Sequence, residues 1–115
     1  MDALDFMNDP EAYDKMEELK AMDISCDAVI ILGERYHKLA LEMAEKEADP
    51  VRKEELKQIA ANLEVVPAHA PQTYWQAIQL YWFTHLAVTT ELNPWDAFSP
   101  GRLDQHLIKY YEADT

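Results

Sequence analysis

The sequence contains 115 residues, with 22 acidic and 10 basic side chains and a formal net charge of -12. Because phosphate contacts need clustered Lys and Arg, this charge argues against a nucleic-acid-binding protein. The 49% content of hydrophobic residues is too high for an acidic disordered tail, which cannot bury enough apolar surface to offset its chain entropy. We therefore expect a folded chain.

The content of Gly and Cys narrows the fold class and the compartment. Two Gly residues leave few positions for hairpins or phosphate-binding loops, which favours an all-helical fold. The single Cys cannot form an internal disulfide, and the N-terminus lacks the basic and apolar regions of a signal peptide. The longest run without charged residues, 65–90, contains prolines and polar side chains. We therefore expect a cytoplasmic protein without a membrane span.

Proline positions and apolar periodicity predict two helices in the first part of the chain. Asp9 and Pro10 form a typical helix start, and this first helix is expected to end near Met22. A second, longer helix is predicted over 24–46. Its mostly apolar stripe consists of Ala28, Ile31, Leu32, Arg35, Leu39, Glu42 and Met43.

A third, amphipathic helix is predicted from Val51 to about Glu64, with Asp49 and Pro50 at its start. Its inward residues are expected to be Leu56, Ile59, Ala60 and Leu63, and its outward residues Arg52, Lys53, Glu54, Glu55 and Lys57. The segment 65–71 contains two prolines. Because each proline disfavours helical backbone in the residue before it, this segment is predicted to be an extended connector.

The helix predicted from Gln72 to about Leu92 is apolar around most of its circumference. Such a helix is normally buried, but a chain of 115 residues has too few other elements to cover it, so we expect an exposed apolar face. Residues 93–98 are predicted to form a turn. A last helix is expected to start with Ser99 as its cap and to end near Glu112. The predicted fold is all-α with about five helices.

The candidate metal ligands and nucleophiles all have ordinary structural interpretations. Glu34 and His37 have the Glu-x-x-His spacing of di-iron bundles, but such a site needs a second motif, which the sequence lacks. No metal site is therefore predicted. Cys26 has no neighbouring His or Cys and is interpreted as a buried, inert thiol. The other histidines lack metal-ligand spacing and are interpreted as structural: His69, His85 and His106.

The stretch 91–106 is more unusual. It places a carboxylate, Asp96, beside Trp95 and Phe98 in a predicted turn between two helices. Burying a carboxylate among apolar side chains costs several kcal/mol unless a partner pairs with it, so such loop groups often have a function. The alternative is a structural turn aspartate that accepts hydrogen bonds from local backbone amides, and composition alone favours this alternative.

A family resemblance is carried by four stretches of the sequence: 49–56, 66–77, 81–83 and 99–107. The last of them reads Ser-Pro-Gly-Arg-Leu-Asp-Gln-His-Leu. In the same order, they resemble the glycyl radical enzymes of the pyruvate formate-lyase-like family. Ser-Pro-Gly-Arg followed by Asp-Gln is typical of the dehydratase and lyase branches. The resemblance covers nearly the whole chain, which is interpreted as part of a pyruvate formate-lyase-like domain over residues 1–115.

The resemblance implies a large, cytoplasmic, oxygen-sensitive enzyme of anaerobic metabolism, with a ten-stranded α/β barrel to which this chain contributes outer helices. The family uses a glycine near the C-terminus, which a separate S-adenosylmethionine-dependent iron-sulfur enzyme converts to a radical, and a cysteine that becomes a thiyl radical. Gly33, Gly101 and Cys26 do not match those motifs. We therefore expect no catalytic residue, metal or bound cofactor in this chain itself.

The same resemblance implies a substrate-binding role for the residues before Ser-Pro-Gly-Arg. In family members that eliminate water or an amine, this stretch contributes to the substrate pocket, and here it holds Trp95, Asp96 and Phe98. The form Glu-Leu-Asn-x-Trp-Asp resembles most the trans-4-hydroxy-L-proline dehydratase branch, beside the glycerol dehydratases. In that branch Asp96 would match an acid that contacts the substrate. Pro94 and the pair Ile108-Lys109 depart from the usual pattern.

Two functions remain in competition from the sequence, and a metal-binding helical bundle is a third, less favoured alternative. In the first, the chain forms part of a glycyl radical dehydratase or lyase, is not catalytic alone, and has the remainder of the enzyme and the radical-activating enzyme as partners. In the second, it is a free-standing acidic helical protein that self-associates or binds another chain through the helix Tyr74–Val88. Neither function involves nucleic acid or a membrane.

Overall fold

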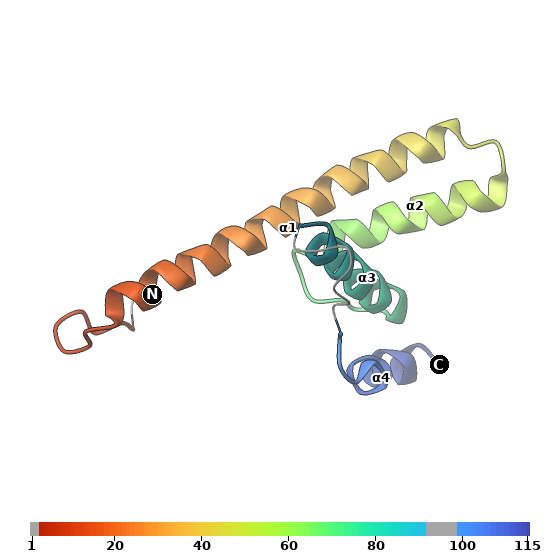
Figure 1. Cartoon of the computed structure of the whole chain (residues 1–115). Helices are drawn as coiled ribbons and strands as arrows, with labels where there is room; N and C mark the ends of the chain where they lie inside the picture. The colour runs from red at the N-terminus through yellow and green to blue at the C-terminus, as the bar shows by residue number, and fades with distance from the viewer. Residues whose placement is uncertain (1–2, 92–98) are drawn as a thin grey trace.

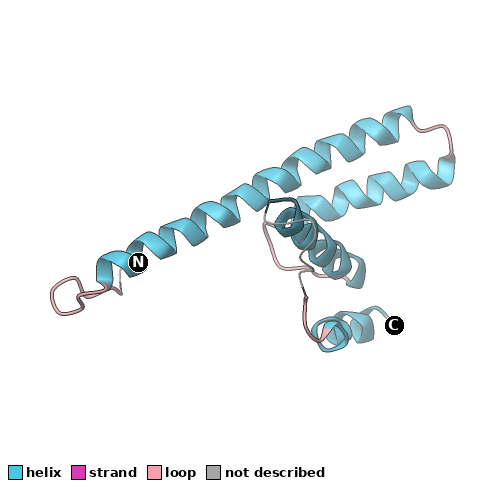
Figure 2. Cartoon of the chain, in the orientation of Figure 1, coloured by secondary structure: helices cyan, strands magenta, loops and turns pink. Residues whose placement is uncertain are grey.

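The computed structural model describes residues 3–91 and 99–115. These residues form four helices, α1 (Ala12–Lys46), α2 (Pro50–Val65), α3 (Tyr74–Glu91) and α4 (Leu103–Asp114), and no strand occurs among them (Figure 2). The all-α prediction is therefore confirmed for the described part of the chain. The molecule is elongated, with extents of 63 × 32 × 31 Å and a radius of gyration of 18.1 Å, against about 13 Å for a compact chain of this length.

The first half of the chain folds into an antiparallel hairpin of α1 and α2, and α2 runs back beside the C-terminal half of α1 (Figure 1). The turn between them is defined by Asp49, whose Oδ1 accepts a hydrogen bond of 3.0 Å from the backbone N–H of Val51. Pro50 occupies the first helical position, where its missing N–H has no cost. The start predicted for this helix is thus confirmed. The N-terminal half of α1 projects beyond the hairpin.

The predicted break near Asp23 is wrong, because α1 is continuous from Ala12 to Lys46. The residues around Asp23 include no Pro or Gly, so no backbone group is lost there. The hydroxyl of Ser25 donates to the carbonyl oxygen of Ala21 at 2.8 Å, so this polar side chain is satisfied inside the helix. Two predicted helices are therefore one, and the described residues form four helices where about five were predicted.

The packed face of α1 also differs from the predicted stripe. Within the predicted stripe only Leu32 is half-buried, and its other members are exposed. Small residues line the buried face instead: Gly33, Ala40 and Ala44. Small side chains let α2 and the connector approach the helix axis closely, while the larger apolar side chains point to a face that no described element covers.

The prediction for α2 is largely confirmed. Leu56, Ala60 and Leu63 are buried and Ile59 is half-buried. The outward charged residues are exposed, except that Lys53 is half-buried. Asn62 lies among the apolar residues with only 1% of its surface exposed.

The connector after α2 begins with the extended residue Val66, which is fully buried, and then turns through a cis peptide bond to Pro67. It places α3 against the hairpin, where Phe83 packs edge-on against Tyr36 of α1 with ring centroids 5.6 Å apart. Gly33 lies under this junction. The extended connector that was predicted is therefore only partly correct.

The last helix starts later than predicted. Ser99 does not cap it, because α4 begins at Leu103 with Arg102 as its N-cap. Gly101 has a φ of 80°, a left-handed conformation that glycine adopts without strain and that no α-helix contains. Residues 99–102 therefore form a separate turn between the preceding segment and α4. The turn predicted over 93–98 lies outside the described residues.

Candidate functional site

The residues predicted to contact substrate, Trp95, Asp96 and Phe98, lie outside the described residues. The structure describes what stands on either side of them, namely α3 as far as Glu91 and the turn that starts at Ser99. The contacts between these two elements therefore define the frame of the candidate site.

Tyr81 of α3 joins the two sides of this frame. Its hydroxyl donates a hydrogen bond of 2.8 Å to the carbonyl oxygen of Pro100. The hydroxyl oxygen of Tyr81 also lies 3.1 Å from Nδ1 of His106 on α4. A phenol has a single proton to donate, so the second contact requires His106 to donate from Nδ1. One side chain of α3 thus binds both the turn and the first part of α4.

A second, independent contact holds the far end of α4. The backbone N–H of Tyr74, at the start of α3, donates to Oδ2 of Asp114 at 2.7 Å. The rings of Tyr74 and Tyr111 meet edge-on with centroids 5.6 Å apart. The two helices are therefore joined at both ends of α4 by different groups.

An apolar groove of about 360 Å³ lies between α1, α2 and α3. Its walls include Tyr36, Leu63 and Phe83, and its rim includes Trp75 and Trp82, which are 46% and 62% exposed. The predicted exposed face of the aromatic helix is thus confirmed. Ile78, which is also exposed, extends the same face, and we call Trp75, Ile78 and Trp82 the α3 apolar face.

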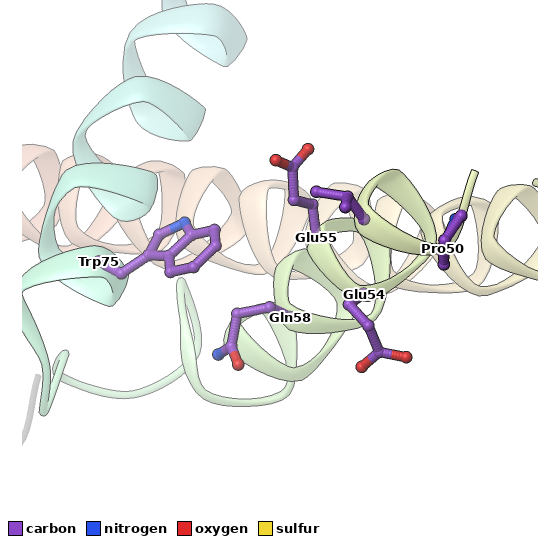
Figure 3. A pocket seen from close by; sticks show the side chains of 6 residues that line it. Pro50, Glu54, Glu55, Gln58 and Trp75 are labelled. Carbon is purple, nitrogen blue, oxygen red and sulfur yellow. The ribbon is translucent and has the colours of Figure 1, made fainter.

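A larger and more open hollow of about 580 Å³ lies between the start of α2 and Trp75. Figure 3 shows Glu54, Glu55 and Gln58 reaching from α2, with the indole of Trp75 opposite. Both carboxylates already have partners, because Glu54 lies 2.6 Å from Lys57 and Glu55 lies 2.7 Å from Arg52. Among the described lining residues, the carboxylates are thus each paired with a cation on the same helix.

The Glu34/His37 pair does not form a metal site in this structure. Nδ1 of His37 donates to the carbonyl oxygen of Ala60 at 2.7 Å, which links α1 to α2, and Nε2 lies 3.9 Å from a carboxylate oxygen of Glu64. Glu34 is exposed. Across residues 3–91 and 99–115, no three His, Cys, Asp or Glu side chains gather as metal ligands would.

The prediction that Cys26 is buried is wrong, because the thiol is exposed. It lies on the half of α1 that projects beyond the hairpin, where no described helix packs (Figure 1). Of the other histidines, His69 and His106 are exposed, while His85 is half-buried and stacks on Trp82 with ring centroids 6.0 Å apart.

Charged groups around the start of α1 have pKa values displaced from their ordinary values. Oδ2 of Asp9 lies 2.7 Å from Nζ of Lys15, and Oδ1 of Asp9 accepts from the N–H of Glu11. These contacts lower the pKa of Asp9, chiefly through the Lys15 hydrogen bond, and raise the pKa of Lys15. The pKa of Asp5 is also lowered, mainly by a hydrogen bond from the side chain of Asn8 and further by one from the backbone N–H of Asn8. The cluster stabilises the start of the helix and lies far from the candidate site along the chain.

Within the described part of the chain, no helix combines the length and the apolarity needed to cross a bilayer.

The family model described as "Pyruvate formate lyase-like" matches residues 1–115. The chain belongs to the pyruvate formate lyase-like family. Among curated members, it is 60% identical over 112 residues to trans-4-hydroxy-L-proline dehydratase of Clostridioides difficile, and this match covers 97% of the chain and 14% of that enzyme. It is 41% identical over 112 residues to isethionate sulfite-lyase of Desulfovibrio desulfuricans, again covering 97% of the chain and 14% of the relative.

Solved structures of pyruvate formate lyase-like proteins contain the same helical arrangement. The hydroxyproline dehydratase of Clostridioides difficile, crystallised with trans-4-hydroxy-L-proline bound, matches 98% of the chain with a TM-score of 0.90 and 59% identity. The B12-independent glycerol dehydratase of Clostridium butyricum matches 94% of the chain with a TM-score of 0.84 and 36% identity. The chain spans about 14% of either structure. The predicted family and its dehydratase branch are therefore confirmed.

The sequence did not reveal the frame of the site. In the sequence Tyr81 lies in the apolar helix and in the stretch 81–83 that carries the family resemblance, whereas its partners Pro100 and His106 lie 19 and 25 residues away. No periodicity or spacing signals a contact of this kind, because it depends on the angle at which α4 packs on α3. The tyrosine hydroxyl at a helical position was the one available indication, since a buried or half-buried phenol usually has a hydrogen-bond partner.

Proposed function

We propose that this chain forms one helical wall of the substrate pocket in a glycyl radical dehydratase that acts on trans-4-hydroxy-L-proline. The proposal is carried by the 60% identity with trans-4-hydroxy-L-proline dehydratase over 97% of the chain. The relatives that act on other compounds are less similar, at 41% for isethionate sulfite-lyase and 42% for (2S)-3-sulfopropanediol dehydratase of Klebsiella oxytoca.

In this proposal Asp96 contacts the substrate, and Trp95 and Phe98 form apolar walls beside it. A carboxylate suits a cyclic hydroxy amino acid, because it pairs with the ring ammonium or accepts a hydrogen bond from the leaving hydroxyl. Charge-assisted contacts of this type fix the orientation of the reacting bond. The hydrogen bonds of Tyr81 support the proposal, since they hold the residues that follow this segment against α3.

The radical machinery does not fit the residues of this chain. A Cβ on Gly33 would lie 2.7 Å from Cδ of Pro67, so this glycine is required by helix packing. Gly101 is explained by its φ of 80° in the turn before α4. In the proposed enzyme the radical glycine, the thiyl cysteine and the contact with an S-adenosylmethionine-dependent activating enzyme belong to other parts of the polypeptide. We assign no radical step to this chain.

The main partner of the chain, in this proposal, is the remainder of a cytoplasmic enzyme. The α3 apolar face, formed by Trp75, Ile78 and Trp82, is exposed, as are the large apolar residues that α1 turns away from the hairpin: Ile31, Leu39 and Met43. Isolated proteins rarely expose apolar surface of this extent. Burial of both surfaces by further polypeptide accounts for side chains that the four helices leave uncovered.

The proposal is tested with the full-length enzyme that contains this sequence. The unactivated protein should bind trans-4-hydroxy-L-proline in calorimetry and prefer it to glycerol and isethionate, and the activated protein should eliminate water from it. Asp96→Asn should reduce turnover sharply while the protein stays folded by circular dichroism. A full-length protein that neither binds nor dehydrates this compound, or an Asp96→Asn variant with unchanged kinetics, would contradict the assignment.

A second function, a free-standing interaction protein that self-associates through the helix Tyr74–Val88, is favoured by the same exposed aromatic face. The two functions differ in what the chain does alone. A monodisperse oligomer in size-exclusion chromatography, with weak binding of an apolar dye, favours the interaction protein. Aggregation or strong dye binding favours a segment that needs the rest of an enzyme.

A further inference from the structure

The hydrogen bonds around Tyr81 have a specific arrangement. The phenol oxygen is the donor to the backbone of Pro100 and the acceptor from Nδ1 of His106. Because the phenol oxygen accepts the proton of His106, the phenol's own proton points to the carbonyl oxygen of Pro100. The histidine therefore sets the direction in which Tyr81 donates. The turn at 99–102 is thereby bound to α3 by a side chain that is itself oriented from α4.

The backbone hydrogen bonds of the turn are made toward α4. Gly101 adopts a φ of 80°, and a Cβ at this position would meet no atom within 4 Å beyond the adjacent residues. Two carbonyl oxygens of the turn accept backbone hydrogen bonds from α4. The oxygen of Gly101 accepts from the N–H of Leu103 at 3.1 Å, and the oxygen of Arg102 accepts from the N–H of His106 at 3.1 Å. The hydrogen bond from the Tyr81 hydroxyl to the Pro100 oxygen connects the turn to α3.

We propose that Tyr81 is a positioning residue of the substrate pocket, whose hydroxyl fixes the turn that directly follows the segment carrying Asp96. The proposal rests on the proposed function, since it gives Tyr81 a role only if Asp96 contacts the substrate. Tyr81 itself touches no substrate in this account. It holds Pro100, in the turn that follows the binding segment, against α3.

The chain provides a matched control for this role. Asp114 binds the other end of α4 to α3 through the backbone of Tyr74 at 2.7 Å. Removing either contact weakens the same helix pair, but only the Tyr81 contact involves the turn. If Tyr81 acts merely by attaching α4, the variants Tyr81→Phe and Asp114→Ala should behave alike.

The experiment measures binding of trans-4-hydroxy-L-proline to the full-length, unactivated enzyme by calorimetry, so that radical content does not affect the result. Tyr81→Phe keeps the ring and loses the two hydrogen bonds, and we expect the Kd to rise about tenfold, as for one or two neutral hydrogen bonds. Asp114→Ala should leave the Kd within about twofold. His106→Ala should weaken binding as Tyr81→Phe does, and His106→Asn, whose amide can donate from near the position of Nδ1, should restore it.

The outcomes separate the two proposals. If Asp96→Asn weakens binding and Tyr81→Phe does not, the positioning role is wrong and the proposed function stands. If Asp96→Asn has no effect on binding or turnover, the proposed function fails, and with it the role of Tyr81. If Tyr81→Phe and Asp114→Ala weaken binding equally, the tyrosine is only a structural attachment. The same conclusion follows if Tyr81→Phe lowers the thermal stability and His106→Asn does not restore the substrate binding that His106→Ala loses.

Discussion

The buried side chain of Asn62 on α2 donates a hydrogen bond from Nδ2 to Oε1 of Gln79 on α3, at 2.8 Å. Gln79 in turn donates from Nε2 to the carbonyl oxygen of Ile59 at 3.1 Å, and Oδ1 of Asn62 accepts from Gln58 at 2.9 Å. Every polar atom of Asn62 therefore has a partner in an environment that is otherwise apolar. Because an amide pair is satisfied only at one relative position of the two helices, this link defines how α3 packs on the hairpin.

Replacing Asn62 should destabilise the protein. Asn62→Ala leaves Oε1 of Gln79 without its donor and Nε2 of Gln58 without its acceptor, and it opens a small cavity, so we expect a loss of about 1–3 kcal/mol in the free energy of unfolding. Urea denaturation of the full-length protein, followed by circular dichroism, measures it. Lys57→Ala, which breaks only the exposed pair with Glu54, is the control and should cost less than about 1 kcal/mol. Equal losses for the two variants would show that the buried amide link does not determine the packing.

A methyl group at Gly33 should also be unfavourable. Alanine is the better helix former by about 1 kcal/mol, but its Cβ would lie 2.7 Å from Cδ of Pro67. Since the proline ring belongs to the connector, relief of this contact requires α1 and the connector to separate, and overpacking of this kind typically costs about 1–3 kcal/mol.

We therefore expect Gly33→Ala to lower the melting temperature, measured by differential scanning calorimetry of the full-length protein. Glu34→Ala, at the next and exposed position, is the control and should be near neutral. A rise in melting temperature for Gly33→Ala would mean that helix propensity outweighs the contact with Pro67.

The start of α1 should fray in acid and in strong base. The folded pKa of Asp9 lies below its ordinary value of 3.8, so its stabilising contribution is fully present above that value and is lost as the pH falls through the folded pKa. The folded pKa of Lys15 lies above 10.5, so its contribution is present below that value and is lost as the pH rises through the folded pKa.

Hydrogen exchange or NMR shifts of the amide of Glu11, which donates to Asp9, should report both transitions. Asp9→Asn should abolish the acid transition at this amide, and Asp14→Asn, which removes another carboxylate from the first turn of α1, should preserve it. Unchanged acid fraying in Asp9→Asn would assign the effect to other carboxylates.

The indole of Trp82 should move from water into protein when the rest of the enzyme is present. Its 62% exposure predicts red-shifted fluorescence for the chain alone. In the full-length enzyme the α3 apolar face should be covered, and the emission should shift to shorter wavelength. The measurement uses Trp75→Phe and Trp95→Phe so that Trp82 remains the sole emitter of the three tryptophans in this sequence. Identical spectra for the two proteins would contradict burial of this face.

Sequence reasoning was reliable where one residue type determines the local backbone. Asp49 and Pro50 define the start of α2 because a side-chain acceptor and a missing N–H both suit a helix N-terminus. It failed at Asp23, where no residue forbids a helix, and at Ser99, where Gly101 takes a left-handed conformation two residues later. In both cases several local conformations were compatible with the residues present.

The amino-acid sequence by itself determined the helical class, the family and the excess of apolar surface on α3, because these depend on composition, motif order and periodicity within single segments. Only the tertiary structure decided which face of α1 is packed and how α4 is attached. Those outcomes depend on contacts between distant residues, such as Gly33 with Pro67 and Tyr81 with His106. Close approach of a backbone and the direction of a hydrogen bond arise from the relative positions of whole helices, which no local pattern encodes.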